Sequence, residues 1–224
     1  MLGLVRHNPE AVATYSQALA DIASRYDLPA WWAGLAASFR GWANWSDAAE
    51  ASSLAEMRRG IGIYREQGMV YLAHSLEAAL AEAEVSAGET DAALRRLDDA
   101  LAEVEATENR WYEAEMHRIR ADILLRRDPA DAAAAEQSLQ AAIAIGQSQK
   151  AHSFELRAAL SLAKLYRAAN RDADAYAVLA PAISADPTIP RTRRGASPSL
   201  GVKPLDRLPP TSRSCLRQRP PIGL

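Results

Sequence analysis

Few residues in this sequence combine the types and spacing that chemistry at an enzyme site requires. Glu113 and His117 are four residues apart, so they would share one helix face as two metal ligands can. No third or fourth ligand is evident, and a solvated pair on a helix surface is the favoured interpretation. Asp98 and Asp99 are adjacent and would point to different sides of a helix, which disfavours a joint catalytic role.

Motifs that bind phosphates or activate nucleophiles are also absent from the sequence. It contains no Gly-x-x-x-x-Gly-Lys-Ser/Thr phosphate loop, no Gly-x-Ser-x-Gly elbow and no His-Glu-x-x-His metal motif. Cys215 is the single cysteine and has no neighbouring base. We therefore expect no catalytic residues, no cofactor and no metal site in this chain.

Four of the five tryptophans lie close together in the sequence: Trp31, Trp32, Trp42 and Trp45. Packing in the core between helices is the favoured interpretation. The alternative is an anchor for an apolar ligand or a peptide, because aromatic side chains often carry binding energy.

Composition indicates an all-α protein with an expected cytoplasmic location. Ala and Leu dominate, and β-branched residues, which favour strands, are few. One thiol cannot form an internal disulfide, which fits a reducing compartment. No apolar run approaches the roughly 20 residues that a membrane span requires, and the first residues do not resemble a secretory signal.

The sequence repeats itself at intervals of about 40 residues, and this is its strongest signal. Four registers recur with spacings of 40 or 42 residues. They are Gly41, Ala81, Ala121 and Ala163; Ser53, Ala93, Ala135 and Ala175; Met57, Leu97, Leu139 and Leu179; and Gly60, Ala100, Ala142 and Ala182. Small residues let two helices approach closely, and the larger ones fill the space beside them.

Each unit is predicted to contain two helices, A and B. Helix A covers residues 29–43, 70–87, 111–126 and 153–168, and helix B covers 47–67, 89–107, 129–147 and 172–184. Gly68, Gly88 and Asn170 mark helix ends, where a left-handed residue is cheapest for Gly or Asn. Asp47 and Asp172 are expected to cap helices, and Pro129 to stand in a first helical turn.

These residues resemble the tetratricopeptide (TPR) repeat family. Matching positions at the family's offsets are Ala163, Tyr166, Ala175, Leu179, Ala182 and Pro187. Asn44 and Ser53 depart from the pattern, and the unit is longer than the common repeat of about 34 residues. The resemblance covers residues 8–184 and implies a right-handed α-solenoid of antiparallel helix pairs.

Longer units of this kind resemble the C-terminal TPR region of bacterial adenylate-cyclase-like and predicted ATPase signalling proteins. The segments that carry this resemblance are Arg40-Gly41-Trp42-Ala43, Trp111-Tyr112-Glu113-Ala114-Glu115 and Glu155-Leu156-Arg157-Ala158-Ala159. It implies a regulatory or interaction scaffold that is a fragment of a larger protein. The alternative is a free-standing adaptor that binds peptides.

The two ends of the chain differ from the four central units, which we assign to residues 29–184. Residues 1–28 are expected to form a partial repeat with helix B alone, because Ala13, Gln17 and Ala20 continue the registers. Residues 185–224 hold 8 of the 12 prolines and 8 basic against 2 acidic residues. This composition predicts a disordered tail, interpreted as a frameshifted reading or as a genuine basic arm.

The resemblance also implies where a ligand would bind, because TPR arrays use the face lined by the A helices. The family's groove offsets fall on Trp42, Trp45, Glu82, Arg118, Asp122, Arg126, Arg157, Lys164 and Arg167. The basic end of this row favours an acidic protein or peptide partner, with a solvated helix face as the alternative. Nucleic acid is not an expected partner, and the uncapped repeat ends favour self-association.

Overall fold

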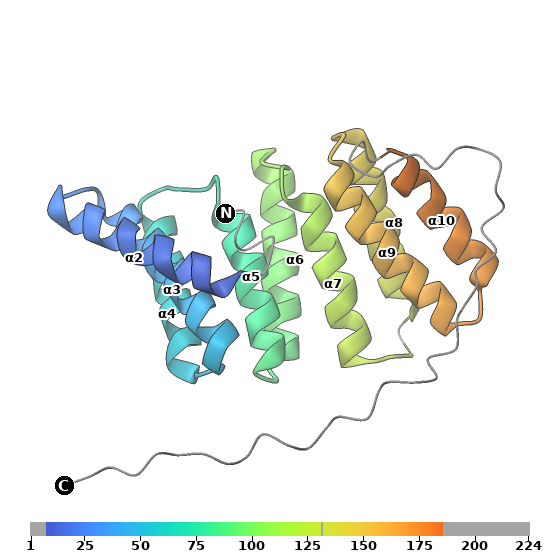
Figure 1. Cartoon of the computed structure of the whole chain (residues 1–224), viewed down its shortest axis with the longest axis horizontal. Coiled ribbons are helices and arrows are strands. Elements are labelled where there is room, and N and C mark those ends of the chain that lie inside the picture. Colours follow the sequence, from blue (N-terminus) through green and yellow to red (C-terminus); the bar gives the residue numbers. More distant parts are fainter. Residues whose placement is uncertain (1–7, 131, 186–224) are drawn as a thin grey trace, which may run out of the picture. The chain divides into compact units, whose positions relative to one another are not determined.

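The described part of the chain is built from α-helices alone. The computed structural model describes residues 8–130 and 132–185, and within them lie nine helices and no strand (Figure 1). The helices are α2 (Pro9–Arg25), α3 (Ala30–Ala48), α4 (Ala51–Glu66), α5 (Ala73–Ser86), α6 (Thr90–Thr107), α7 (Glu113–Arg127), α8 (Ala132–Ser148), α9 (His152–Ala168) and α10 (Asp172–Ala185). The predicted all-α class is confirmed. Of the predicted tail, Ala185 is the last residue of α10, and residues 186–224 lie outside the described residues.

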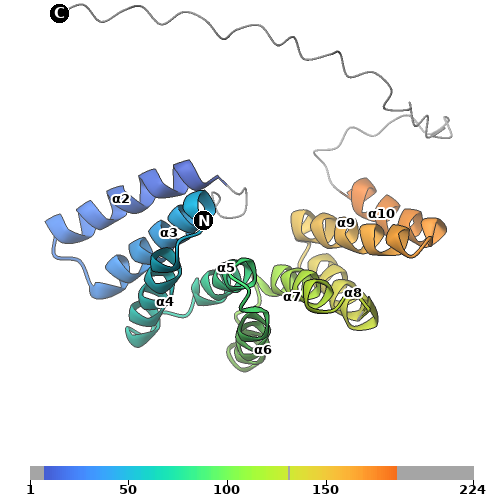
Figure 2. The ribbon, with the colours of Figure 1, turned by 90° about the horizontal axis from the view of Figure 1, so that it is seen from below.

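Helices that are adjacent in sequence pack on one another along the whole series. In addition, α3 contacts α5, α5 contacts α7 and α7 contacts α9, so these four form one continuous row. Figure 2 shows that α4, α6 and α8 lie along one side of that row. The row matters for function because its four helices share a common surface.

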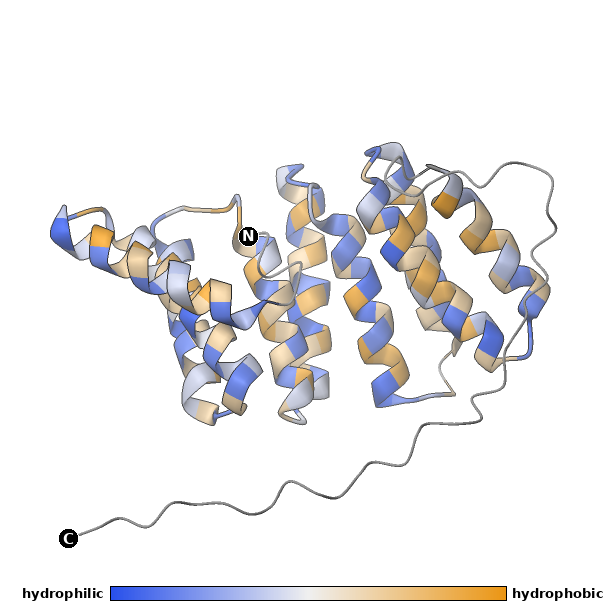
Figure 3. Cartoon of the chain, viewed as in Figure 1, coloured by the Kyte–Doolittle hydropathy of each residue, from blue (hydrophilic) through white to orange (hydrophobic). Residues whose placement is uncertain are grey.

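The four repeating registers coincide with the helix-packing core. Of their sixteen members, only Leu179 is half-buried, and all the others are buried. Ala81, Ala121, Ala135 and Ala142 have no exposed surface at all. Apolar and polar residues alternate along the helices (Figure 3). The period read from the sequence is therefore the period of helix packing.

The ends of the helices follow the same period at positions whose residue types differ. Asp27, Gly68, Glu108 and Lys150 follow α2, α4, α6 and α8, and all four have positive φ, between 49° and 73°. They are spaced by 40 to 42 residues. Gly68, Gly88 and Asn170 were expected to adopt this left-handed conformation, and they do. Asp27, Glu108 and Lys150 adopt the same conformation, although they are neither Gly nor Asn.

Two predicted helix starts were wrong. Asp47 does not cap α4, because it lies inside α3, which continues to Ala48 and ends at the left-handed Ala49. Pro129 lies in the turn before α8, which begins at Ala132. The predicted cap at Asp172 stands one position later than expected, as the first residue of α10. By contrast, α2 has a true side-chain cap, because Asn8 Oδ1 accepts from the Ala11 N–H at 3.0 Å.

Turns between successive units are joined by side-chain hydrogen bonds at the repeat spacing. Trp111 Nε1 donates to the carbonyl oxygen of Tyr71 at 2.8 Å, and the two rings stack with centroids 5.7 Å apart. Gln149 Nε2 donates to the carbonyl oxygen of Arg110 at 2.7 Å. These bonds satisfy backbone groups at helix ends and fix the stagger between neighbouring units.

A network of ion pairs between α4, α5 and α6 was missed by sequence reasoning. Glu84 of α5 accepts from Arg58 of α4 at 3.0 Å and from Arg96 of α6 at 2.8 Å. Arg96 also reaches Glu77 at 2.6 Å, and Arg65 pairs with Glu77 at 2.8 Å. Burial alone would raise the pKa of Glu84, but the hydrogen bonds from Arg96 and Arg58 outweigh it and lower the pKa.

Candidate functional site

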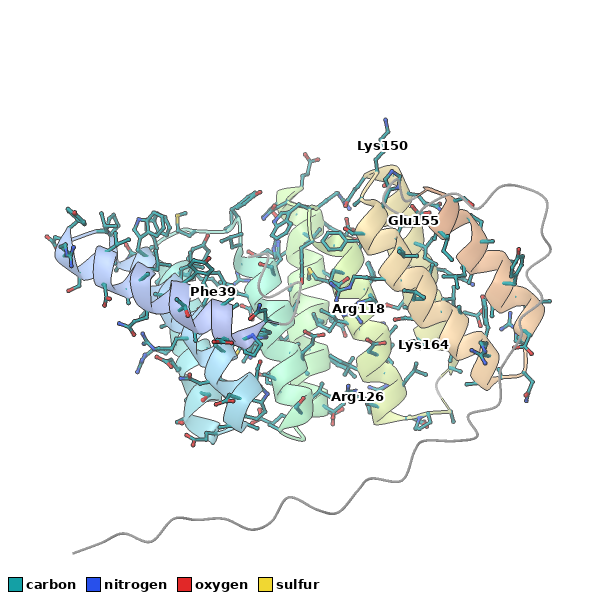
Figure 4. All side chains as sticks on the ribbon, in the orientation of Figure 1. Phe39, Arg118, Arg126, Lys150, Glu155 and Lys164 are labelled. Atoms are coloured by element: carbon teal, nitrogen blue, oxygen red, sulfur yellow. The ribbon has the colours of Figure 1, made fainter. Side chains whose placement is uncertain are left out.

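The surface of the α3–α5–α7–α9 row holds two adjoining cavities. One lies between α3, α5 and α7 and has a volume of about 460 Å³. The second lies between α7 and α9 and has a volume of about 490 Å³. Asp122 lines both, so the cavities meet at α7. Figure 4 shows Arg118 and Arg126 along α7 and Lys164 on the neighbouring α9.

The first cavity, here called the Trp pocket, has an aromatic side and a charged side. It is defined by Trp42, Trp45, Glu82, Ile119, Asp122 and Arg126. Ala79, Ala83 and Ile123 complete an apolar wall. Its volume and its apolar lining with a few polar groups are typical of a small-molecule or side-chain pocket.

The second cavity, here called the basic pocket, is defined by Arg118, Asp122, Leu125, Ser161, Lys164 and Leu165. Arg118 is buried, whereas Lys164 is exposed at its rim. The pocket therefore contains both basic groups and one carboxylate, which suits a polar ligand better than an apolar one.

Arg118 is the centre of the charges on this surface. Its Nε and Nη2 atoms each lie 2.8 Å from Glu115 Oε1, Nη1 bonds to Asp122, and Nη2 lies 3.4 Å from Glu82 Oε1. Arg157 of α9 reaches the same Glu115 oxygen at 2.7 Å. The cluster thereby joins α5, α7 and α9.

Glu115 is the most deeply buried carboxylate of this cluster. Its side chain is 1% exposed, and its Oε2 atom has no hydrogen-bond partner. Burial would lower the pKa of Arg118, but its bond to Glu115 and the nearby Asp122 and Glu82 raise it instead. Burial and the carboxylates of Glu115 and Glu82 raise the pKa of the Tyr112 hydroxyl. Arg118 thus stays charged and Tyr112 stays neutral at physiological pH.

Most of the predicted groove residues are brought together. Five of them line the Trp pocket, namely Trp42, Trp45, Glu82, Asp122 and Arg126. Arg118 and Lys164 line the basic pocket, and Arg157 contacts Glu115 beside it. Arg167 is set apart, because its side chain is 76% exposed and lies 3.9 Å from Asp172 of α10. A binding role for these residues remains a prediction.

The predicted tryptophan cluster divides into two pairs. Trp31 and Trp32 stack on each other with centroids 4.0 Å apart, and Trp31 meets Tyr64 edge-on at 6.2 Å. Trp31 packs against the core, as the favoured interpretation expected, and Trp42 and Trp45 do so as well. Trp42 and Trp45 also line the Trp pocket.

Glu113 and His117 were the other candidates for chemistry, and each has a defined environment in the structure. Glu113 accepts from Arg110 at 2.9 Å, and burial lowers the pKa of the half-buried His117. Within residues 8–130 and 132–185, no three His, Cys, Asp or Glu side chains are grouped so that they could hold a metal ion. Sequence reasoning missed Glu115, although it stands three residues before Arg118 on the same helix and thus on a neighbouring position of its surface.

Comparison with known proteins finds one informative similarity. The chain is 30% identical over 167 residues to an uncharacterised protein of Rhizobium meliloti (strain 1021). The match covers 71% of this chain but 15% of that protein, so the chain spans a small part of the relative's length. No protein-family model matches the chain. No solved structure matches it either.

Proposed function

We propose that this chain is a protein-interaction or regulatory scaffold that binds a segment of a partner in the groove formed by the Trp pocket and the basic pocket. The observation that carries the proposal is the junction of two cavities at Asp122 on a row of helices. A peptide a few residues long would contact both cavities at once, and such grooves recur in peptide recognition. The scaffold has no catalytic activity of its own in this proposal.

The proposed architecture is a right-handed, TPR-like α-solenoid of antiparallel helix pairs, with about 40 residues in each unit. Two features support it: the contacts between alternate helices of the row, and the left-handed residues that recur at the repeat spacing. The position of Asp27 at this spacing supports α2 as helix B of a further unit.

We further propose that the scaffold belongs to a larger signalling protein. The relative from Rhizobium meliloti supports this, because the aligned region is a small part of a much longer chain. The proposal that this larger protein is an ATPase or is cyclase-like rests on the resemblance of the repeat segments alone. A free-standing adaptor is the second candidate, and the reading frame upstream in the gene distinguishes the two.

We expect the acidic group of a partner to bind at the rim of the basic pocket. Arg157 already contacts Glu115 at 2.7 Å, so an acidic group would compete with that carboxylate. Arg167 lies away from both pockets, so Lys164 is the residue of the predicted basic end that lies at the rim of the basic pocket. A cytoplasmic location remains part of the proposal. In the residues that the structure describes, no helix has both the length and the apolar character needed to cross a bilayer.

A peptide display experiment tests the proposal. Peptides enriched on the full chain would be measured for affinity against the wild type and against Lys164→Glu, which reverses a charge at the rim of the basic pocket. Lys150→Glu makes the same change at the exposed turn before α9 and is the matched control. We expect Lys164→Glu to weaken binding about tenfold and Lys150→Glu to leave it unchanged. Equal effects of the two variants would contradict the groove.

A further inference from the structure

The Trp pocket combines aromatic rings with carboxylates, and this combination has a definite ligand preference. We propose that it binds an organic cation, either an ammonium or a guanidinium group. The source would be a basic side chain of a partner segment or a small amine. The inference rests on the proposed groove, and it specifies the charge of the group that enters one end of it.

The aromatic side of the pocket comes from α3. Trp42 and Trp45 are three residues apart, so both side chains lie on one face of that helix and line the cavity. Trp42 is 6% exposed and Trp45 is half-buried, so both rings are held in place by packing. Of the aromatic side chains, Trp attracts cations most strongly, because the face of its ring is electron-rich.

The carboxylates come from the two helices opposite. Glu82 of α5 and Asp122 of α7 line the same cavity, and 36% and 41% of their side-chain surfaces are exposed. Both carboxylates interact with the guanidinium of Arg118. Arg118 lies closer to Glu115 than to Glu82, which it reaches at 3.4 Å. A carboxylate has about four acceptor positions, so Asp122, which accepts from Arg118, keeps capacity for another donor.

The environment of Asp122 also favours an additional cation. Although Asp122 is partly exposed, desolvation raises the pKa of its carboxyl against the opposing effects of Arg118 and Arg126. A bound ammonium or guanidinium would offset this desolvation and stabilise the charged form of the carboxylate. An anionic ligand would meet Arg126 in this pocket, but it would also meet Glu82 and Asp122.

The apolar wall strengthens this preference. Ala79, Ala83 and Ile123 exclude water from one side of the cavity, and interactions between charges are stronger where water is excluded. The methylene groups of a Lys or Arg side chain would pack against the same wall. The cavity of about 460 Å³ has room for such a side chain.

Indole resonances of the labelled full chain would test the proposal. The chain has five tryptophans, and we expect only the Trp42 and Trp45 signals to move when N-acetyl-arginine methylamide is added. N-acetyl-citrulline methylamide has nearly the same shape without the charge, and it should bind about fivefold more weakly or less. Raising the salt concentration from 50 to about 500 mM should weaken arginine binding in the wild type.

Variants and further probes complete the test. Glu82→Gln and Asp122→Asn should each weaken arginine binding about fivefold, while Asp99→Asn on the exposed side of α6 should not change it. Tighter binding of the peptide Gly-Gly-Arg-Gly-Gly than of agmatine would identify a partner segment as the source. The reverse order would identify a small amine.

Three results would overturn the inference: equal binding of the citrulline compound, stronger binding of N-acetyl-glutamate methylamide at the same indoles, or shifts confined to Trp31, Trp32 and Trp111. Failure of the cation probes alongside Lys164-dependent binding of displayed peptides would overturn this inference and leave the proposed scaffold standing. Cation binding without any peptide binding would overturn the proposed scaffold and leave the cation site standing.

Discussion

Gly60 of α4 lies directly against the backbone of Gly34 on α3. A Cβ atom on Gly60 would stand 2.6 Å from the carbonyl oxygen of Gly34, and 2.6 Å from both the backbone nitrogen and the Oγ of Ser38. Real Cβ atoms do not approach backbone atoms so closely, so only glycine allows this separation of the two helices. Gly60 belongs to one of the four repeating registers, whose small residues are buried in the other units as well.

We therefore predict that Gly60→Ala destabilises the protein by about 2–3 kcal/mol, because the two helices must separate. Gly62 on the same helix has nothing within 4 Å of its Cβ position, which makes it a matched control. Gly62→Ala should stabilise by about 0.5–1 kcal/mol through helix propensity. Urea unfolding measures both, and a loss of stability in both variants would contradict the close packing.

Glu108 ends α6 in the left-handed conformation, with φ of 56°. A residue with a Cβ is strained there, and glycine is not. We expect Glu108→Gly to stabilise the protein by about 1 kcal/mol, measured as a higher urea midpoint. Glu105→Gly, at an exposed position inside the same helix, should instead destabilise by about 1 kcal/mol. If both substitutions destabilised, the left-handed turn would not be a source of strain.

Much of the fold could be predicted from the sequence because packing imposes its period on small residues. Ala81, Ala121 and Ala163 repeat at intervals near 40, and the structure buries each of them. The groove offsets likewise placed Trp42 and Asp122, 80 residues apart in sequence, in one cavity. The burial of these alanines and the shared cavity both depend on spacing that the repeat preserves from unit to unit.

Features that depend on single turns or on charged cores were not predicted. The prediction for the start of α8 was wrong because Pro129 fits a turn as well as a first helical residue. The left-handed conformation of Lys150 has no sequence signature. The residues of the ion-pair network were assigned no role from the sequence. However, Arg58 and Arg65, like Glu77 and Glu84, are seven apart, a spacing that aligns two side chains on one helix face.

Glu84 should contribute strongly to stability above its unfolded pKa. Its side chain is 1% exposed and its partners Arg58 and Arg96 would lose a buried anion in Glu84→Gln. We predict a loss of about 3 kcal/mol at pH 7, measured by urea unfolding. Glu105→Gln, exposed on α6, is the control and should change little.

The effect of Glu84→Gln should also depend on pH. Hydrogen bonds from Arg96 and Arg58 lower the pKa of Glu84 despite its burial, so the unfolded chain takes up this proton first as the pH falls. The stabilisation is present above the unfolded pKa of about 4.3 and is lost as the pH falls through the lower folded value. A difference between wild type and variant that stays constant down to pH 2 would count against the pairing.

His117 has the opposite character, because burial lowers its pKa. The unfolded chain therefore binds a proton more readily than the folded one below the unfolded pKa of about 6.5, and stability should fall as the pH decreases through that value. Proton NMR of the ring should give a folded pKa below 6.5. The His117→Gln variant should lose less stability than the wild type between pH 7.5 and 5.5, and an equal loss would remove His117 as the cause.

Self-association through the ends of the helix series is the last prediction. On α2, Tyr15 and Ile22 are 74% and 48% exposed, and their spacing of seven residues places them along one helix face. Tyr26, which follows the last residue of α2, is 66% exposed. On α10, Tyr176 and Ile183 are 65% and 38% exposed and are also seven apart. Large exposed apolar residues in a row favour association.

The full chain should therefore elute as a larger species in size-exclusion chromatography as its concentration rises. Combined Tyr15→Glu and Ile22→Glu substitutions should restore the monomer, whereas Val70→Glu, 43% exposed at the turn before α5, should not. A wild type that elutes as a monomer at every concentration would show that these faces do not bind one another.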